Sequence, residues 1–263
     1  MTVTARPSAL ARWGEIERLL TDRRPALFLD YDGTLAPLAP RPDLATLPEA
    51  TREVLRRLAD RFPVAVLSGR AREDVAALVD LDALTYAGGH GFDIAGPSIR
   101  HELGEGIPEV IERAAVSLRR RLGDRPGVLV EPKRFAVAVH FRLARKADLP
   151  YVEEAVDAVL ADHPELRKTW GKKVFELRPA LDWIDWDKGR VLLWLLEEMG
   201  LEESSTLPVY LGDDLTDEDA FRALEATGLG ILVATEPRPT AARYSLGDPV
   251  EVREFLERVA GLS

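Results

Sequence analysis

Short, continuously apolar segments alternate along the chain with longer segments whose apolar residues recur every three or four positions. The continuous segments are residues 26–30, 63–67, 83–87, 208–211 and 230–234, and the periodic segments are residues 8–20, 49–61, 72–79, 188–199, 216–224 and 250–260. Strands that are apolar on both faces are typical of a parallel sheet with helices on both sides. The pattern therefore predicts a doubly wound α/β core.

The pattern changes between residue 97 and residue 182. Two helical segments, 108–122 and 151–160, are each followed by a pair of segments with strand character; these are residues 127–133, 135–142, 166–171 and 173–178. Neighbouring strands joined by short turns favour an antiparallel sheet. We therefore predict an inserted αββαββ unit over 97–182, with the parallel core formed by residues 1–96 and 183–263.

The composition narrows the possible functions. The 263 residues carry a formal charge of −10 and include no cysteine, which excludes disulfides, a thiol nucleophile and thiolate metal sites. The acidic balance argues against a nucleic-acid or anionic membrane surface, and no apolar run approaches the ~18 residues of a membrane span. No signal peptide is evident near the N-terminus. We expect a monomeric cytoplasmic protein that acts on a small molecule.

Asp30 and Asp32 directly follow the first apolar segment. Residues two apart in an extended chain point the same way, and ligands bind at strand ends in open α/β sheets. Two adjacent carboxylates favour a cation, and oxygen ligands favour Mg²⁺. Asp30 can act as a nucleophile on phosphorus, Asp32 as general acid and base, and Thr34 as a phosphate donor. The alternative is a solvated turn.

Three further motifs occur at predicted strand ends or at the start of a helix. Ser68 follows the second strand, Lys188 begins a helix, and Asp213 and Asp214 follow the strand at 208–211. Ser68 and Lys188 can bind a phosphoryl group, and the two aspartates can complete a metal site. Each has an ordinary alternative: a helix cap, a surface lysine or an acidic helix start. Their joint occurrence in this order favours the chemical interpretation.

These four motifs resemble those of the haloacid-dehalogenase-like superfamily over essentially the whole chain. The resemblance implies that Asp30 is the nucleophile, that Asp32 is the general acid and base, and that Thr34, Ser68 and Lys188 bind phosphate. It also implies that Mg²⁺ is bound by Asp30, the Asp32 backbone carbonyl and Asp213, with Asp214 close behind. The inserted unit resembles the larger cap domain of that superfamily.

Within the superfamily, the closer resemblance is to the trehalose-6-phosphate phosphatases, most specifically through the decapeptide from Gly212 to Phe221. The resemblance implies a Mg²⁺-dependent phosphatase that acts on trehalose 6-phosphate through an aspartyl phosphate. It implies the following substrate-binding residues: Arg70, His90, Glu131, Lys133, Arg142 and Glu176. For the charged residues of the insertion, the alternative is a set of exposed cross-strand charge pairs.

The substrate stays open among related sugar phosphates. The segment before Asp187 contains Trp183 and Trp186 where a shorter hinge of small residues is expected, which can reshape the substrate site. The alternative is a phosphatase of the same fold for a glucosylglycerol, glucosylglycerate or sucrose phosphate. A non-catalytic carbohydrate-binding domain is a further hypothesis, but such a domain would have lost a motif, and all four are intact.

Overall fold

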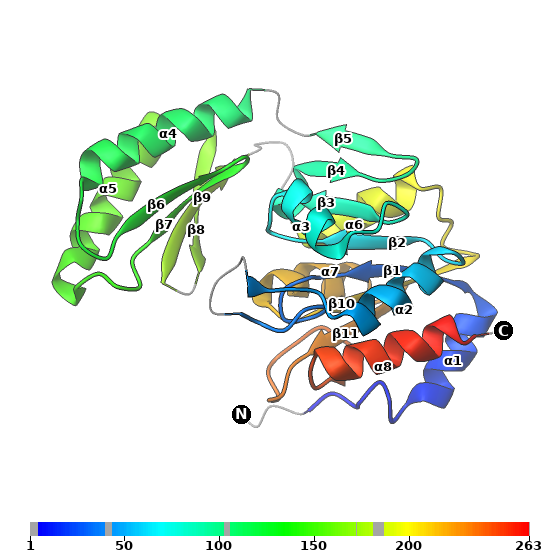
Figure 1. Ribbon diagram of the computed structural model, residues 1–263. Coiled ribbons are helices and arrows are strands. Elements are labelled where there is room, and N and C mark those ends of the chain that lie inside the picture. Colours follow the sequence, from blue (N-terminus) through cyan, green and yellow to red (C-terminus); the bar gives the residue numbers. More distant parts are fainter. Residues whose placement is uncertain (1–4, 40–43, 103–105, 172, 181–186, 263) are drawn as a thin grey trace. The chain divides into compact units, whose positions relative to one another are not determined.

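A computed structural model describes residues 5–39, 44–102, 106–171, 173–180 and 187–262. The chain divides into two compact units (Figure 1). The first comprises Met1–His101 and Trp186–Ser263, and the second comprises Glu102–Asp185. Residues 97–101, which the sequence placed at the start of the insertion, therefore group with the first unit. Trp183 and Trp186 lie outside the described residues.

The first unit is built on a sheet of eight strands in the order β12-β11-β10-β1-β2-β3-β4-β5. The strands are β1 (Arg24–Leu29), β2 (Val64–Leu67), β3 (Thr85–Gly88), β4 (Asp93–Ala95), β5 (Arg100–Glu102), β10 (Thr206–Gly212), β11 (Leu229–Val233) and β12 (Tyr244–Leu246). The pairs from β12 through to β3 are all parallel, and β4 is antiparallel to β3. The predicted parallel sheet is confirmed. The sequence did not predict β4, β5 or β12, because three residues are too few to show a period.

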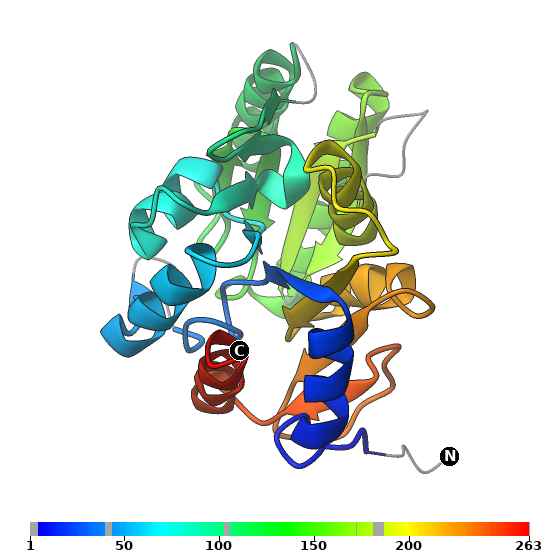
Figure 2. The same cartoon turned by 90° about the vertical axis from the view of Figure 1, so that its right-hand side faces the viewer.

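Helices cover both faces of this sheet. They are α1 (Trp13–Asp22), α2 (Glu49–Ala59), α3 (Arg72–Val79), α6 (Lys188–Glu198), α7 (Glu218–Ala223) and α8 (Pro249–Ala260). Helix α2 packs beside α8 on one face and α6 beside α7 on the other, as Figures 1 and 2 both show. Helix α1 begins later than the predicted segment 8–20, because Ser8 is instead bridged to Ser245 of β12.

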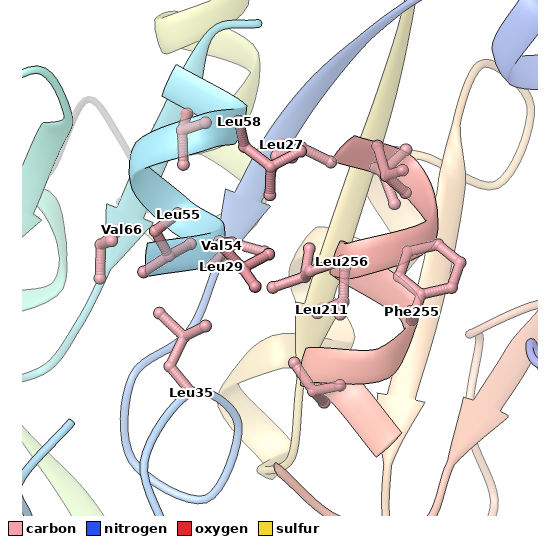
Figure 3. Packing of buried hydrophobic residues seen from close by; sticks show 14 of the residues in the cluster. Leu27, Leu29, Leu35, Val54, Leu55, Leu58, Val66, Leu211, Phe255 and Leu256 are labelled. Atoms are coloured by element: carbon pink, nitrogen blue, oxygen red, sulfur yellow. The ribbon is translucent and has the colours of Figure 1, made fainter. Parts of the chain in front are cut away.

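The core forms where the apolar faces of α2 and α8 meet the central strands (Figure 3). Helix α2 contributes Val54, Leu55 and Leu58, which are spaced to share one side of the helix. Phe255 and Leu256 of α8 belong to the same buried cluster. The strands contribute Leu27, Leu29, Val66 and Leu211. This packing holds β1 and β10 side by side.

The strand order reverses at β1. The chain moves from β1 to β2 and β3 on one side and later returns to place β10 against the other side of β1. In open α/β sheets such a reversal leaves a crevice at the carboxyl ends of the strands, where ligands bind. The fold therefore marks the ends of β1 and β10 as the position of a site.

The second unit has the element order α4 (Ile107–Leu122), β6 (Leu129–Lys133), β7 (Ala136–His140), α5 (Leu149–Asp162), β8 (Leu166–Gly171) and β9 (Val174–Pro179). Its four strands form an antiparallel sheet in the order β6-β7-β9-β8. Helices α4 and α5 both pack on this sheet. This is the αββαββ order that the sequence predicted. Within the part of the chain that the structure describes, no helix is long and apolar enough to cross a bilayer.

Replacing Leu55 by alanine tests the packing between α2 and the sheet. The Leu55 side chain is fully buried, so Leu55→Ala leaves a cavity and should lower the free energy of unfolding by about 2–5 kcal/mol. Urea unfolding followed by circular dichroism measures this change. Leu193→Ala on α6, where the leucine is 44% exposed, is the control and should have a much smaller effect. Equal effects would contradict the assigned core.

Candidate active site

The ends of β1 and β10 bring two predicted motifs together. The strands pair in parallel with Leu29 opposite Leu211, and the amide of Asp30 donates a hydrogen bond to the carbonyl of Leu211 at 2.9 Å. Asp30 therefore leaves β1 at the same edge of the sheet at which Asp213 follows β10. The two carboxylates that lie far apart in the sequence become neighbours.

The turn after Asp30 is tight and closely packed. Gly33 has a φ of +85°, which favours glycine, and a Cβ atom placed there would lie 2.2 Å from Oδ2 of Asp213. The next residue, Thr34, is fully buried, and its Oγ1 has no hydrogen-bond partner among the described residues. A buried hydroxyl group is normally hydrogen-bonded. Thr34 therefore has a donor available for a ligand such as a phosphate oxygen.

Lys188 contacts both the segment that follows β1 and the segment that follows β10. It is the first residue of α6, whose N-cap Asp187 accepts a hydrogen bond from the amide of Arg190 at 2.9 Å. Its buried Nζ donates to Oδ1 of Asp30 at 2.7 Å and to Oδ1 of Asp217 at 2.5 Å. Burial opposes the charge on the lysine, but the two carboxylates prevail and raise the pKa of Lys188. The site therefore holds a fixed positive charge beside the candidate nucleophile.

Two opposing effects act on the pKa of Asp30, the candidate nucleophile. Burial raises its pKa well above the usual range of an aspartate, and the ammonium group of Lys188 acts in the opposite direction. Asp217 and Asp213 add negative charge nearby and also raise this pKa. A carboxylate in such surroundings is stabilised by any further cation that enters the site.

Asp217 is a site residue that the sequence did not single out. Its side chain has no solvent exposure. Besides Lys188, it accepts hydrogen bonds from the hydroxyl of Tyr210 at 2.7 Å and from the amide of Asp214 at 2.8 Å. The available signal was its position four residues after Asp213, but the sequence interpretation counted residues 216–219 as an acidic helix start. That interpretation is partly right, because Asp214 and Asp217 form a capping box ahead of α7.

Three carboxylates can hold a metal ion. Oxygen atoms of Asp30, Asp213 and Asp217 all lie within 4.8 Å of one another. Burial, together with Asp217 and Asp214, raises the pKa of Asp213 to about 7. Crowded carboxylates with oxygen ligands only are the donor set that suits Mg²⁺, so the residues present fit the predicted cofactor.

The sequence predicted that the Asp32 backbone carbonyl binds the metal, with Asp214 close behind, and the side chains of both residues have other partners. Both oxygens of Asp32 accept hydrogen bonds from Arg70, at 2.7 Å from Nε and 2.6 Å from Nη2. The Asp32 side chain is 35% exposed. Oδ1 of Asp214 accepts from the amide of Leu215 at 2.7 Å. Neither side chain belongs to the group of three carboxylates.

Ser68, Arg70 and His90 lie together beyond the end of β2. The Ser68 hydroxyl accepts from the amide of Arg70 at 3.1 Å, and the Ser68 carbonyl accepts from the amide of His90 at 3.0 Å. His90 has a φ of +60°, and its ring approaches so closely that a Cβ on Gly69 would lie 2.7 Å from it. These contacts hold residues 68–70 and His90 together, and the side chain of Arg70 extends to Asp32.

Three of the predicted sugar-binding residues share one face of the sheet in the second unit. Glu131 and Glu176 lie opposite Ala138 on its two sides, and Lys133 donates to Oε1 of Glu176 at 2.9 Å. The same face carries residues that the sequence missed: His140, which is hydrogen-bonded to Glu131, and Thr169 and Arg178, which are both hydrogen-bonded to Glu176. Arg142 lies in an exposed turn after β7. This is a polar face rich in paired donors and acceptors.

Comparison with known proteins agrees with this geometry. Residues 28–250 match the family model of the trehalose-phosphatases. The chain is 40% identical to trehalose 6-phosphate phosphatase RA3 of Zea mays, over 97% of this chain and 74% of the relative. It is 44% identical to a trehalose-phosphate phosphatase of Mycobacterium bovis, over 97% of this chain and 66% of the relative.

Solved structures agree as well. A trehalose-6-phosphate phosphatase related protein aligns with a TM-score of 0.76 at 26% identity, covering 90% of this chain and 97% of that one. The C-terminal domain of the C. albicans trehalose-6-phosphate phosphatase shares the fold, with a TM-score of 0.78 at 22% identity and full coverage of both chains. On this evidence, the chain is a phosphatase of haloacid-dehalogenase-like fold that belongs to the trehalose-phosphatase family.

Proposed function

We propose that this enzyme hydrolyses trehalose 6-phosphate to trehalose and phosphate, with Mg²⁺ and through an aspartyl phosphate on Asp30. The observation that carries the proposal is the contact between the buried Lys188 ammonium and Asp30, beside Asp213. The names of its relatives in maize and M. bovis support the substrate. The expectation of a monomeric cytoplasmic enzyme stays a prediction.

The chain's own residues supply the steps of the reaction. A carboxylate oxygen of Asp30 attacks phosphorus, the bond from phosphorus to the sugar oxygen breaks, and Asp32 gives the leaving oxygen a proton. A water molecule then attacks phosphorus, Asp32 takes its proton, and the bond to Asp30 breaks. Lys188, Thr34 and Ser68 hold the phosphoryl oxygens during both steps. Arg70, which binds Asp32 in the structure, has to release that carboxylate for proton transfer.

The metal would be held by the side chains of Asp30 and Asp213 and by the backbone carbonyl of Asp32, with Asp214 behind them. When bound, Mg²⁺ offsets the repulsion between Asp30 and the phosphate dianion. The Asp217 carboxylate already accepts hydrogen bonds from Lys188, Tyr210 and the amide of Asp214. We therefore assign Asp217 to the orientation of Lys188 and leave the metal to the other two carboxylates.

The second unit acts, on this proposal, as a cap that recognises the disaccharide. Glu131, Lys133, Glu176 and Arg142 would exchange hydrogen bonds with sugar hydroxyls, and Arg70 and His90 would contact the substrate from the core. Fixed carboxylates and cations can accept from and donate to several hydroxyls at once. The pairing of Glu176 with both Lys133 and Arg178 keeps its carboxylate in one orientation.

A substrate panel tests the proposed activity. Purified protein with Mg²⁺ should release phosphate from trehalose 6-phosphate much faster than from sucrose 6-phosphate, glucosylglycerol phosphate, glucosylglycerate phosphate or glucose 6-phosphate. Excess EDTA should abolish the release, because Lys188 alone then offsets the repulsion between Asp30 and the phosphate dianion. A preference for another glycoside phosphate would overturn the substrate assignment and leave the chemistry intact. Full activity in EDTA would overturn the role of the metal.

Replacing Asp30 by asparagine tests the covalent mechanism. Asp30→Asn keeps the size of the side chain but removes the nucleophilic oxygen, so kcat should fall by at least about 10³-fold. The circular dichroism spectrum should not change. Asp82→Asn is a suitable control, because the exposed Asp82 precedes β3 and so lies toward the opposite edge of the sheet. Normal turnover by Asp30→Asn would contradict the proposed formation of an aspartyl phosphate on Asp30.

Replacing Gly33 by alanine tests the proposed metal site. The added Cβ would lie 2.2 Å from Oδ2 of Asp213, so Asp213 has to move and the Mg²⁺ concentration for half-maximal activity should rise about tenfold or more. Gly106→Ala is the matched control, because Gly106 has a similar φ of +82° and no atom within 4 Å of an added Cβ. The control should keep the normal Mg²⁺ dependence. The same Mg²⁺ dependence in both variants would argue against Asp213 as a ligand.

A further inference from the structure

Tyr210 is a buried residue of β10 that the proposed reaction does not use. Its side chain has no solvent exposure, and its ring packs edge-on against Phe221 of α7 with the centroids 5.7 Å apart. The ring therefore has one orientation, and it directs the hydroxyl group at Oδ1 of Asp217, 2.7 Å away. A buried tyrosine needs one partner for its hydroxyl group. Here that partner is a carboxylate inside the active site.

The Asp217 carboxylate is shared among three donors. Oδ1 accepts from Tyr210 and from Nζ of Lys188, and Oδ2 accepts from the amide of Asp214. A carboxylate has about four acceptor positions, so this one has little freedom to rotate. Nζ of Lys188 therefore shares Oδ1 of Asp217 with the Tyr210 hydroxyl group, and its second hydrogen bond goes to Oδ1 of Asp30.

Burial makes Tyr210 a permanent donor. Loss of water, followed by the negative charge of Asp217, raises the pKa of Tyr210 well above its ordinary value. The hydroxyl group is therefore protonated at neutral pH and acts as a donor to Asp217.

We propose that Tyr210 is a positioning residue of the reaction: by holding Asp217 in place, it keeps the Lys188 ammonium on Asp30 and on the phosphoryl group that Asp30 receives. This inference rests on the proposed function, because it assigns Tyr210 to the mechanism given for Asp30 and Lys188. Without the hydroxyl group, Asp217 can rotate and draw Lys188 toward itself. The nucleophile and the phosphoryl group would then lose part of the charge that stabilises the transition state.

The chain contains a matched control for this residue. Tyr244 is also a buried tyrosine, and its hydroxyl group also donates to a carboxylate, Oε1 of Glu15, at 2.7 Å. Glu15 lies on α1 and is not part of the site. Tyr210→Phe and Tyr244→Phe each remove one oxygen atom and one tyrosine–carboxylate hydrogen bond. A general effect on stability should appear in both variants, whereas an effect on the reaction should appear only in Tyr210→Phe.

The experiment measures kcat, KM and the melting temperature of the full chain and of both variants, with activity expressed per folded protein. Tyr210→Phe should lower kcat for trehalose 6-phosphate about tenfold, because misplacing a catalytic charge slows the chemical step. The KM should change less than about twofold, because the sugar contacts lie elsewhere. Tyr244→Phe should keep the normal kcat. Equal kcat values for both variants would overturn the inference.

A second measurement separates positioning from stability. Beryllium trifluoride mimics a phosphoryl group on a carboxylate, so its inhibition constant reports on the groups that surround that state. Tyr210→Phe should weaken this inhibition several-fold, and Tyr244→Phe should not. Unchanged inhibition by both would reject the role of Tyr210, even if both variants were less stable.

Failure of the proposed function would be visible elsewhere. The unchanged protein would then release no phosphate from trehalose 6-phosphate, or Lys188→Ala would be as active as the unchanged protein. Failure of the present inference leaves the unchanged protein active, Lys188→Ala impaired and Tyr210→Phe normal. The two failures therefore give different results in the same assay.

Discussion

The candidate active site depends on one buried ammonium group that two carboxylates share. Lys188 contacts Asp30 and Asp217 with almost no access to water. A buried lysine without partners would lose its charge, and a buried pair of aspartates without a cation would take up protons. Each group therefore needs the others, and the parts of the chain that carry them, the end of β1, the start of α6 and the segment after β10, have to meet at one point. The strand order provides that point, because β10 returns to the side of β1.

The charged groups can meet because glycine residues let the backbone pass close to the carboxylates. A Cβ on Gly212 would lie 2.3 Å from Cγ of Asp217, so the glycine at the end of β10 allows the carboxylate to turn back toward the sheet. The glycine of the first turn likewise makes room for Asp213. The glycines of the two motifs thus serve the placement of carboxylates as much as the turning of the chain. This explains why each motif contains a glycine next to its acidic residues.

In the second unit, too, positively charged side chains hold carboxylates in place. Its polar face pairs Lys133 and Arg178 with one carboxylate, Glu176, and pairs His140 with Glu131. The exposed pair between His140 and Glu131 contributes little to stability, so its value lies in orientation. A face with fixed donors and acceptors is suited to recognise a polar ligand, while the opposite face packs on α4 and α5.

The sequence by itself determined the parallel core, the αββαββ order of the insertion and the four motifs, because strand and helix periods and turn residues are local signals. It also predicted Asp30, Ser68 and Asp213 as site residues through their position at strand ends, and Lys188 through its position at the start of a helix. It did not identify Tyr210 or Asp217 as members of the site, since one looks like an apolar strand residue and the other like a helix cap. It also missed β4, β5 and β12, whose three residues acquire strand geometry only from the strands beside them. Only the tertiary structure decided these points, because the partner of a buried polar group is chosen by packing across segments that lie far apart in the chain.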